Sequence, residues 1–137
     1  MNALHRKLSI KNSRLNKRDR LQFSNQRLIM MLYEWRIYNA VPGKMSALND
    51  RFQKNTIRLF EKHGIKPVGF WEAVIGTTNI LYYMLAWESM AEREKAWSSF
   101  QADPEWKKAM QESEKDGPIV QSITNMLLRP TPYSSMK

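Results

Sequence analysis

Hydrophobic and polar residues alternate from residue 32 to residue 38, and this pattern predicts a β-strand with two unlike faces. One face would be apolar, with Tyr33, Trp35 and Ile37. The other would carry a charge pair and a tyrosine, namely Glu34, Arg36 and Tyr38. The Val-Pro-Gly sequence at 41–43 is typical of a turn and ends the strand.

After the turn, the spacing changes to steps of three and four, which predicts a helix from residue 44 to residue 63. Its inward stripe would consist of Met45, Leu48, Phe52, Thr56, Leu59 and His63. We expect Arg51 and the other charged residues of this segment to cover the remaining sides. Gly64 suits the helix end, because glycine adopts the left-handed conformation there at little cost.

The rest of the chain predicts two more strands, a helical region and a fourth strand. Residues 68–75 and 80–87 would form an antiparallel hairpin around the turn at 76–79. Ser89 and Glu92 have capping-box spacing, and Asp103-Pro104 would begin a second helical segment. Residues 119–128 complete the order β-α-β-β-α-β. The predicted class is therefore α+β, a ferredoxin-like fold with helices on one face of a four-stranded antiparallel sheet.

The third strand is apolar on both faces, so the face away from the helices also needs a cover. A bare apolar sheet face of this size exceeds what soluble monomers usually expose. We therefore predict a homodimer in which two sheets pack face to face as a dimeric α/β barrel.

Charge separates the chain into two parts. The 137 residues carry a formal net charge of +9, and residues 1–30 contain eight Lys or Arg against Asp19 alone. We predict a basic, disordered leader at 1–30 and one domain at 31–137. Three interpretations of the leader stay open: a tail that touches nucleic acid or lipid, a transit peptide, or sequence translated ahead of a true start at Met30 or Met31.

Several function classes are disfavoured by what the sequence lacks. It has no cysteine and two histidines, so no thiol chemistry and no metal site are expected. It has no phosphate loop, no dinucleotide fingerprint and no Gly-x-Ser-x-Gly elbow. The basic residues after residue 30 form no stripe with aromatics, so the domain is not expected to bind nucleic acid. No apolar run reaches the roughly 20 residues of a transmembrane helix.

Several motifs in register resemble NIPSNAP-domain proteins. They are Tyr33-Glu34-Trp35-Arg36-Ile37-Tyr38, Leu59-Phe60-Glu61-Lys62-His63-Gly64, Gly69-Phe70-Trp71, Ala86-Trp87-Glu88-Ser89, Asp103-Pro104-Glu105-Trp106 and Leu128-Arg129-Pro130-Thr131-Pro132-Tyr133. The resemblance covers 31–137 and implies the dimeric α/β-barrel superfamily. That superfamily includes small monooxygenases, isomerases and haem-binding proteins, whereas the family's own activity is largely undefined. A cytoplasmic protein is expected, with a mitochondrial one as the alternative if residues 1–30 are a transit peptide.

We predict that the domain binds a small aromatic or carboxylated ligand in the barrel cavity, with cofactor-free oxygenase or isomerase chemistry as an extension. Glu34 and Arg36 are the candidate catalytic pair, as base and anion holder. The candidate ligand-binding residues are Tyr38, His63, Trp71, Tyr82, Asn125, Arg129 and Tyr133. Several have a structural alternative: an ion pair for Glu34 and Arg36, a capping or packing role for His63, core or dimer packing for Trp71 and Tyr82, and contact with the partner subunit for Tyr133. No cofactor is predicted, with haem as a minor alternative, and the alternative function is a non-catalytic protein-interaction module.

Overall fold

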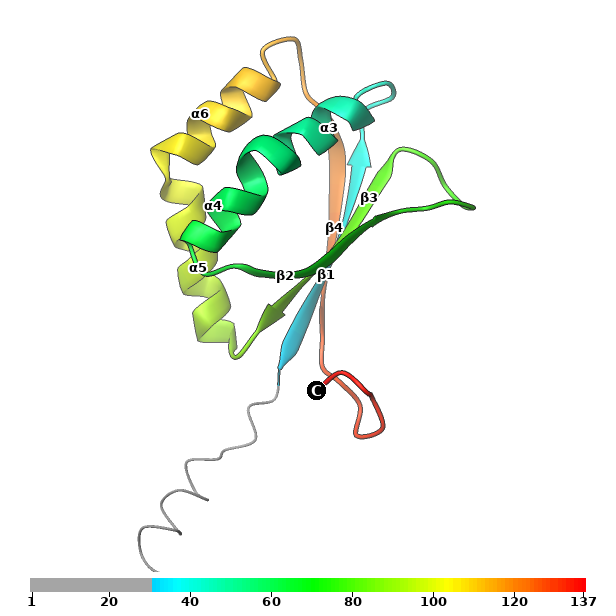
Figure 1. Ribbon diagram of the computed structural model, residues 1–137, viewed down its shortest axis with the longest axis vertical. Coiled ribbons are helices and arrows are strands. Elements are labelled where there is room, and N and C mark those ends of the chain that lie inside the picture. Colours follow the sequence, from blue (N-terminus) through cyan, green and yellow to red (C-terminus); the bar gives the residue numbers. More distant parts are fainter. Residues whose placement is uncertain (1–30) are drawn as a thin grey trace, which may run out of the picture.

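The computed structural model describes residues 31–137, so the predictions made for residues 1–30 lie outside it. Its four strands form one antiparallel sheet in the order β2-β3-β1-β4 (Figure 1). The strands are β1 (Leu32–Ala40), β2 (Lys66–Glu72), β3 (Ile80–Trp87) and β4 (Val120–Leu128). The central position of β1 places the Glu34 motif in the middle of the sheet.

The helices all lie on one side of this sheet (Figure 1). One helical run follows β1 and is made of α3 (Met45–Arg51), η1 (Phe52–Thr56) and α4 (Ile57–Lys62). The second region follows β3 and contains α5 (Met90–Ala102) and α6 (Pro104–Ser113). The order β-α-β-β-α-β confirms the predicted ferredoxin-like α+β fold. None of the helices in residues 31–137 is long and apolar enough to cross a membrane.

The register of the sheet assigns its side chains to two faces, because directly paired antiparallel residues share a face. On β3, exposure alternates strictly, and the buried set is Leu81, Tyr83, Leu85 and Trp87. Glu34 pairs with Leu85 and Arg36 with Tyr83, so the charge pair belongs to the face that meets the helices. The opposite, open face carries Trp35, Tyr82 and their neighbours.

The helix after β1 is not regular throughout. Residues 52–56 form a π-helical turn, in which the Thr56 hydroxyl donates to the Arg51 carbonyl over 3.2 Å. Arg51 and Phe52 are both buried, with 6% and 5% exposure, so the prediction that Arg51 covers an outer side was wrong. Arg51 lies three residues after buried Leu48 and therefore on the same side of the helix. Wide turns of this kind are frequent at functional sites.

The second strand also differs from its prediction. It ends at Glu72, opposite Leu81, and residues 73–79 form a protruding hairpin tip instead of continuing the strand (Figure 1). Val74 and Ile75 are almost fully exposed there, so these two apolar side chains do not contribute to the core of the domain.

Two helix ends have the geometry predicted from the sequence: Gly64 has φ +72°, and the Ser89 hydroxyl accepts a hydrogen bond from the Glu92 amide.

Candidate ligand site between the helices and the sheet

Glu34 lies at the centre of a buried polar cluster on the helix-facing side of β1. Its side chain is fully buried and accepts five hydrogen bonds. Two come from Arg93 on α5, both at 2.8 Å, and one from Arg36 at 2.8 Å. The indole N–H groups of Trp87 and Trp97 donate the other two, at 2.9 and 3.1 Å.

This surrounding fixes the charge of the Glu34 carboxylate. Burial alone would raise its pKa, but the donors from Arg93, Trp97 and Arg36 outweigh burial and lower the pKa to about 2. The carboxylate is therefore ionised at neutral pH, with both oxygens occupied. Such a group is a poor proton acceptor, and the geometry favours a positioning role for Glu34 over that of a base.

Arg36 connects this cluster to Tyr38. Its guanidinium lies 4.6 Å from the ring centre of Trp97, and its Nη2 donates to the Tyr38 hydroxyl over 3.2 Å. Burial by itself would lower the pKa of Arg36. The nearby Tyr38 and Tyr83 hydroxyls and Glu34 raise the pKa by more than burial lowers it, so it lies above its ordinary value. The Tyr83 hydroxyl also donates to Tyr38, over 3.0 Å. Because the Tyr38 oxygen accepts both bonds, its own proton is left to donate elsewhere.

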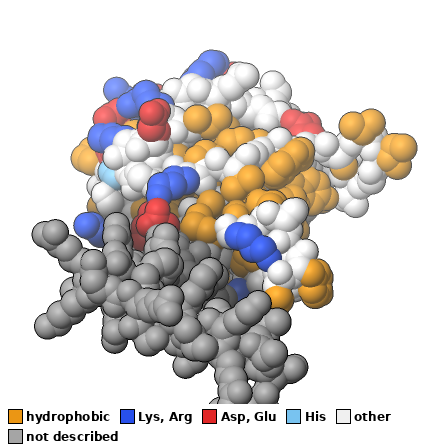
Figure 2. Space-filling view, turned by 60° about the horizontal axis from the view of Figure 1, so that its bottom comes forward, with side chains coloured by type: hydrophobic (Ala, Val, Ile, Leu, Met, Phe, Trp, Pro, Cys, Tyr) orange, Lys and Arg blue, Asp and Glu red, His pale blue; other side chains and the backbone are white. Residues whose placement is uncertain are grey.

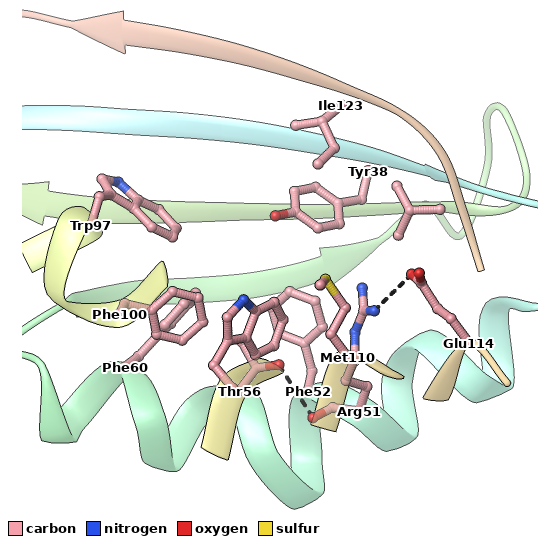
Figure 3. Close-up of a pocket in the computed structure, with 12 residues that line it drawn as sticks. Tyr38, Arg51, Phe52, Thr56, Phe60, Trp97, Phe100, Met110, Glu114 and Ile123 are labelled. Carbon is pink, nitrogen blue, oxygen red and sulfur yellow. Dashed lines mark hydrogen bonds and ion pairs between the residues drawn. The ribbon is translucent and has the colours of Figure 1, made fainter. Parts of the chain in front are cut away.

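Tyr38 lines a cavity of about 170 Å³ between the sheet and the helices (Figure 3). The wall is mainly aromatic and aliphatic, and it comes from β1 and β4 of the sheet and from the helical segments α3, η1, α4, α5 and α6. The lining residues are Tyr38, Arg51, Phe52, Thr56, Phe60, Trp97, Phe100, Trp106, Met110, Glu114, Val120 and Ile123. A few polar groups among aromatics are typical of small-ligand pockets.

A second arginine reaches the cavity from the helix layer. Arg51 rises from α3 toward the sheet, and its Nη1 donates to Glu114 over 3.0 Å (Figure 3). The Arg51 side chain is only 5% exposed, and its guanidinium lies 5.4 Å from the ring centre of Trp106. Its Nε is buried without a hydrogen-bond partner in the described part of the chain.

Of the nine predicted site residues, Tyr38 is the one that lines this cavity. Glu34 and Arg36 lie behind it, joined through the Arg36–Tyr38 hydrogen bond. Asn125 is exposed on β4 opposite Arg36, on the same face of the sheet. The structure therefore brings Glu34, Arg36 and Tyr38 into one network, with Asn125 beside it.

The other predicted residues lie elsewhere. Trp71 and Tyr82 pair with each other on the open face, where Trp71 stacks on Trp35 at 5.6 Å between ring centres. The structure thus separates them from the Glu34 cluster by the thickness of the sheet. Arg129 and Tyr133 follow β4 and are exposed, Tyr133 by 90%.

His63 follows the end of α4 and does not line the cavity, although its ring packs against the lining residue Phe100 at 6.1 Å between ring centres. Its ring nitrogens contact the Ser99 hydroxyl at 2.7 Å and the Asp103 carboxylate at 2.6 Å. These contacts fit the structural alternative, because they join α4 to the junction of α5 and α6. Hydrogen bonds from Lys62, His63 and the Glu105 amide keep the pKa of Asp103 below its ordinary range. Within residues 31–137, no three His, Cys, Asp or Glu side chains are grouped as a metal site would need.

Four residues of the site were not predicted as functional candidates from the sequence, namely Arg51, Glu114, Thr56 and Arg93. Arg51 had a detectable signal, namely its helical spacing from Leu48. Glu114 had none, because it follows α6 and meets Arg51 only through the fold, 63 residues apart in the chain.

Comparisons with known proteins agree with this architecture. The NIPSNAP family model matches residues 33–135. A NIPSNAP-like domain protein from Burkholderia xenovorans has a TM-score of 0.69 at 22% identity, and the match covers 77% of this chain and 89% of that one. A NIPSNAP family protein of unknown function from Agrobacterium tumefaciens has a TM-score of 0.69 at 23% identity, covering 78% and 94%.

A more distant likeness concerns the fold alone. A Nitrosomonas europaea protein named as an antibiotic biosynthesis monooxygenase has a TM-score of 0.55 at 7% identity, covering 77% of this chain and 94% of that one. No curated protein sequence matches the chain significantly. The family match covers every helix described above and all of the sheet except Leu32, and the chain belongs to the NIPSNAP family.

Proposed function

We propose that this NIPSNAP domain binds a small anionic molecule with a ring-sized apolar body in the cavity between its helices and its sheet. The observation that carries the proposal is the pairing of an aromatic cavity with Tyr38, a lining residue whose hydroxyl oxygen already accepts two hydrogen bonds. An apolar body would replace water against the aromatic side chains, and an acceptor oxygen would take the hydrogen bond from Tyr38.

The size of the cavity supports a ligand of about one ring. A cavity of about 150 Å³ lined by apolar side chains is known to hold benzene, and this one measures about 170 Å³. A larger ligand would have to displace the side chains that form the wall, at the cost of their packing.

The charges around the cavity support an anion. At the cavity wall Arg51 is paired with Glu114, whereas behind the wall Arg36 and Arg93 share the single carboxylate of Glu34. One positive charge is thus left without a carboxylate of its own behind the wall. A monoanion in the cavity would balance it in a setting where water screens charges weakly.

We propose binding as the primary role and assign Glu34 to positioning Arg36 and Trp97. Cofactor-free oxygenase or isomerase chemistry is supported here only by the wider superfamily, and it would need a base other than Glu34. Tyr38 would be the group nearest a bound ligand that could donate a proton.

Titration calorimetry of the full chain with benzoate and with neutral benzamide tests the proposal. We expect benzoate to bind the wild type with a Kd below about 1 mM and to bind more tightly than benzamide. The Tyr38→Phe variant should weaken benzoate binding about fivefold, the equivalent of one ordinary hydrogen bond. Tyr33→Phe is the matched control, since the Tyr33 hydroxyl bonds the Lys137 carbonyl on the other face. Equal affinities for all three proteins, or no binding, would refute the proposal.

We also propose that the open face of the sheet is the contact surface of a homodimer. Its residues on β1, β3 and β4 include no charged side chain, so a two-fold copy of this face meets no like-charge repulsion. Hydrophobic side chains gather beside the protruding hairpin tip (Figure 2). The partly exposed large ones include Trp71, Met126 and Leu128.

Light scattering of the full chain tests this second proposal. A dimer has twice the 16.2 kDa mass of one chain, and Trp71→Ala should shift the equilibrium toward the monomer. Lys108→Ala, an exposed change on the outer helices, should leave the mass unchanged. A monomeric wild type would overturn the dimer and favour the interaction module, with the same face docking a different protein.

A further inference from the structure

The two residues of the Arg51–Glu114 ion pair at the cavity wall differ in their exposure to solvent. The Arg51 side chain is 5% exposed, whereas the side chain of Glu114, which directly follows α6, is 34% exposed. The cation is thus fixed in the wall, while its carboxylate partner reaches solvent. Glu114 lines the cavity as well, so a ligand in the cavity would meet both groups (Figure 3).

The hydrogen bonds of Arg51 use one part of its guanidinium. Both described side-chain bonds run through Nη1, to Glu114 at 3.0 Å and to the Ser113 hydroxyl at 3.3 Å. The Nε is buried and has no partner in the described part of the chain. A planar guanidinium can hold a carboxylate through two parallel N–H donors. Glu114 engages Arg51 through Nη1 alone, so further N–H donors of this guanidinium remain for a second carboxylate.

We propose that Glu114 is an internal competitor, whose carboxylate occupies Arg51 until the carboxylate of a ligand takes its place. This inference rests on the proposed function and names its ligand class, a monocarboxylate carried on a single ring or a body of similar size. It also assigns Arg51 as the group that recognises the carboxylate, with the Tyr38 hydroxyl as a further donor to the same ligand.

The exchange has a physical advantage over simple entry. A buried cation left without a partner is costly, and so is a carboxylate moved from water into an apolar wall alone. If one carboxylate replaces the other, Arg51 has a carboxylate partner both before and after the ligand binds. The released Glu114 keeps its charge in water, because its side chain already reaches the surface.

The exchange also predicts selectivity. A neutral amide gains nothing from the removal of Glu114, because it cannot replace the lost charge beside Arg51. When the Glu114 carboxylate is removed, a ligand carboxylate can use the freed Arg51 guanidinium and no longer lies beside a like charge. Both effects raise the affinity for the ligand carboxylate. The preference for benzoate over benzamide should therefore depend on residue 114.

The experiment compares the affinities of benzoate and benzamide for the full-length wild type, Glu114→Gln and Glu112→Gln. Glu112 is the matched control, since it lies on the same helix, is 68% exposed and does not line the cavity. We expect Glu114→Gln to bind benzoate about tenfold more tightly, the effect of about one charge-assisted hydrogen bond, and benzamide unchanged. Glu112→Gln should match the wild type for both compounds.

Arg51→Met keeps a long apolar side chain in the wall and should abolish the preference for benzoate over benzamide. The melting temperature of each variant, with and without benzoate, shows whether it is folded, and benzoate should raise that of Glu114→Gln more than that of the wild type. Benzoate binding that is equal in wild type and Glu114→Gln would overturn the exchange and leave the proposed function standing. Failure of both proteins to bind either compound would overturn both.

Discussion

Replacing Glu34 with glutamine removes the negative charge that holds two guanidinium groups inside the domain. Glu34 is fully buried, while the side chains of Arg36 and Arg93 are 12% and 21% exposed. The pKa of Glu34 falls from 4.5 to about 2. A shift of that size corresponds to about 3 kcal/mol of folding free energy. Removing one partner of a buried ion pair costs about 3–5 kcal/mol, which agrees with this value.

The effect should depend on pH with a defined sign. A depressed carboxyl pKa stabilises the folded state fully above the unfolded pKa, and the contribution disappears as the pH falls through the folded pKa. The difference between wild type and Glu34→Gln should therefore be constant above about pH 5.5, and should shrink by about 1.4 kcal/mol per pH unit below about pH 4.5.

Urea unfolding followed by tryptophan fluorescence, at pH 7 and at steps down to about pH 3.5, measures this difference. Glu61→Gln on α4 is the control, because Glu61 is exposed and should change the stability by less than about 0.5 kcal/mol. A loss below about 1 kcal/mol at pH 7, or a difference that stays constant down to low pH, would refute the reasoning.

Three further changes test local features by the same unfolding assay. Gly64→Ala should cost about 1 kcal/mol, because alanine is strained at φ +72° although space is free there, and Gly64→Asn should cost less; equal stability of all three would contradict this. Ser89→Ala should cost about 1 kcal/mol through loss of the α5 cap, and an unchanged stability would show that the cap is not needed. Thr56→Val keeps the side-chain shape but removes the hydrogen bond to the Arg51 carbonyl, so a loss of about 1 kcal/mol is expected, and no loss would mean that the π turn holds without it.

The sheet and helix order could be predicted from the sequence because each element carries a local signal. The alternation on β1 and β3, the capping box at Ser89 and the glycine at position 64 all depend on neighbours a few residues away. The family motifs were equally local, and the family match confirms them.

The site could not be assembled from the same signals. Alternation separates Glu34 from Tyr33, but it does not say which face meets the helices, so the residues of both faces were predicted to share one cavity. The contacts that define the site are long-range, from Arg93 to Glu34 and from Arg51 to Glu114. In a sequence, a buried arginine on a helix cannot be distinguished from a surface arginine unless its partner is known. For this reason Arg51 was predicted on the solvent-facing side of its helix.

The five tryptophans allow the central claim to be tested in one measurement. Trp97 and Trp106 line the cavity, Trp35 and Trp71 stack on the open face, and Trp87 is buried against Glu34. In proton–nitrogen correlation spectra of the full chain titrated with benzoate, we predict that the indole signals of Trp97 and Trp106 shift with one saturating curve. Those of Trp35 and Trp71 should stay in place. Shifts confined to Trp35 and Trp71, or no shift at any indole, would contradict a ligand site between the helices and the sheet.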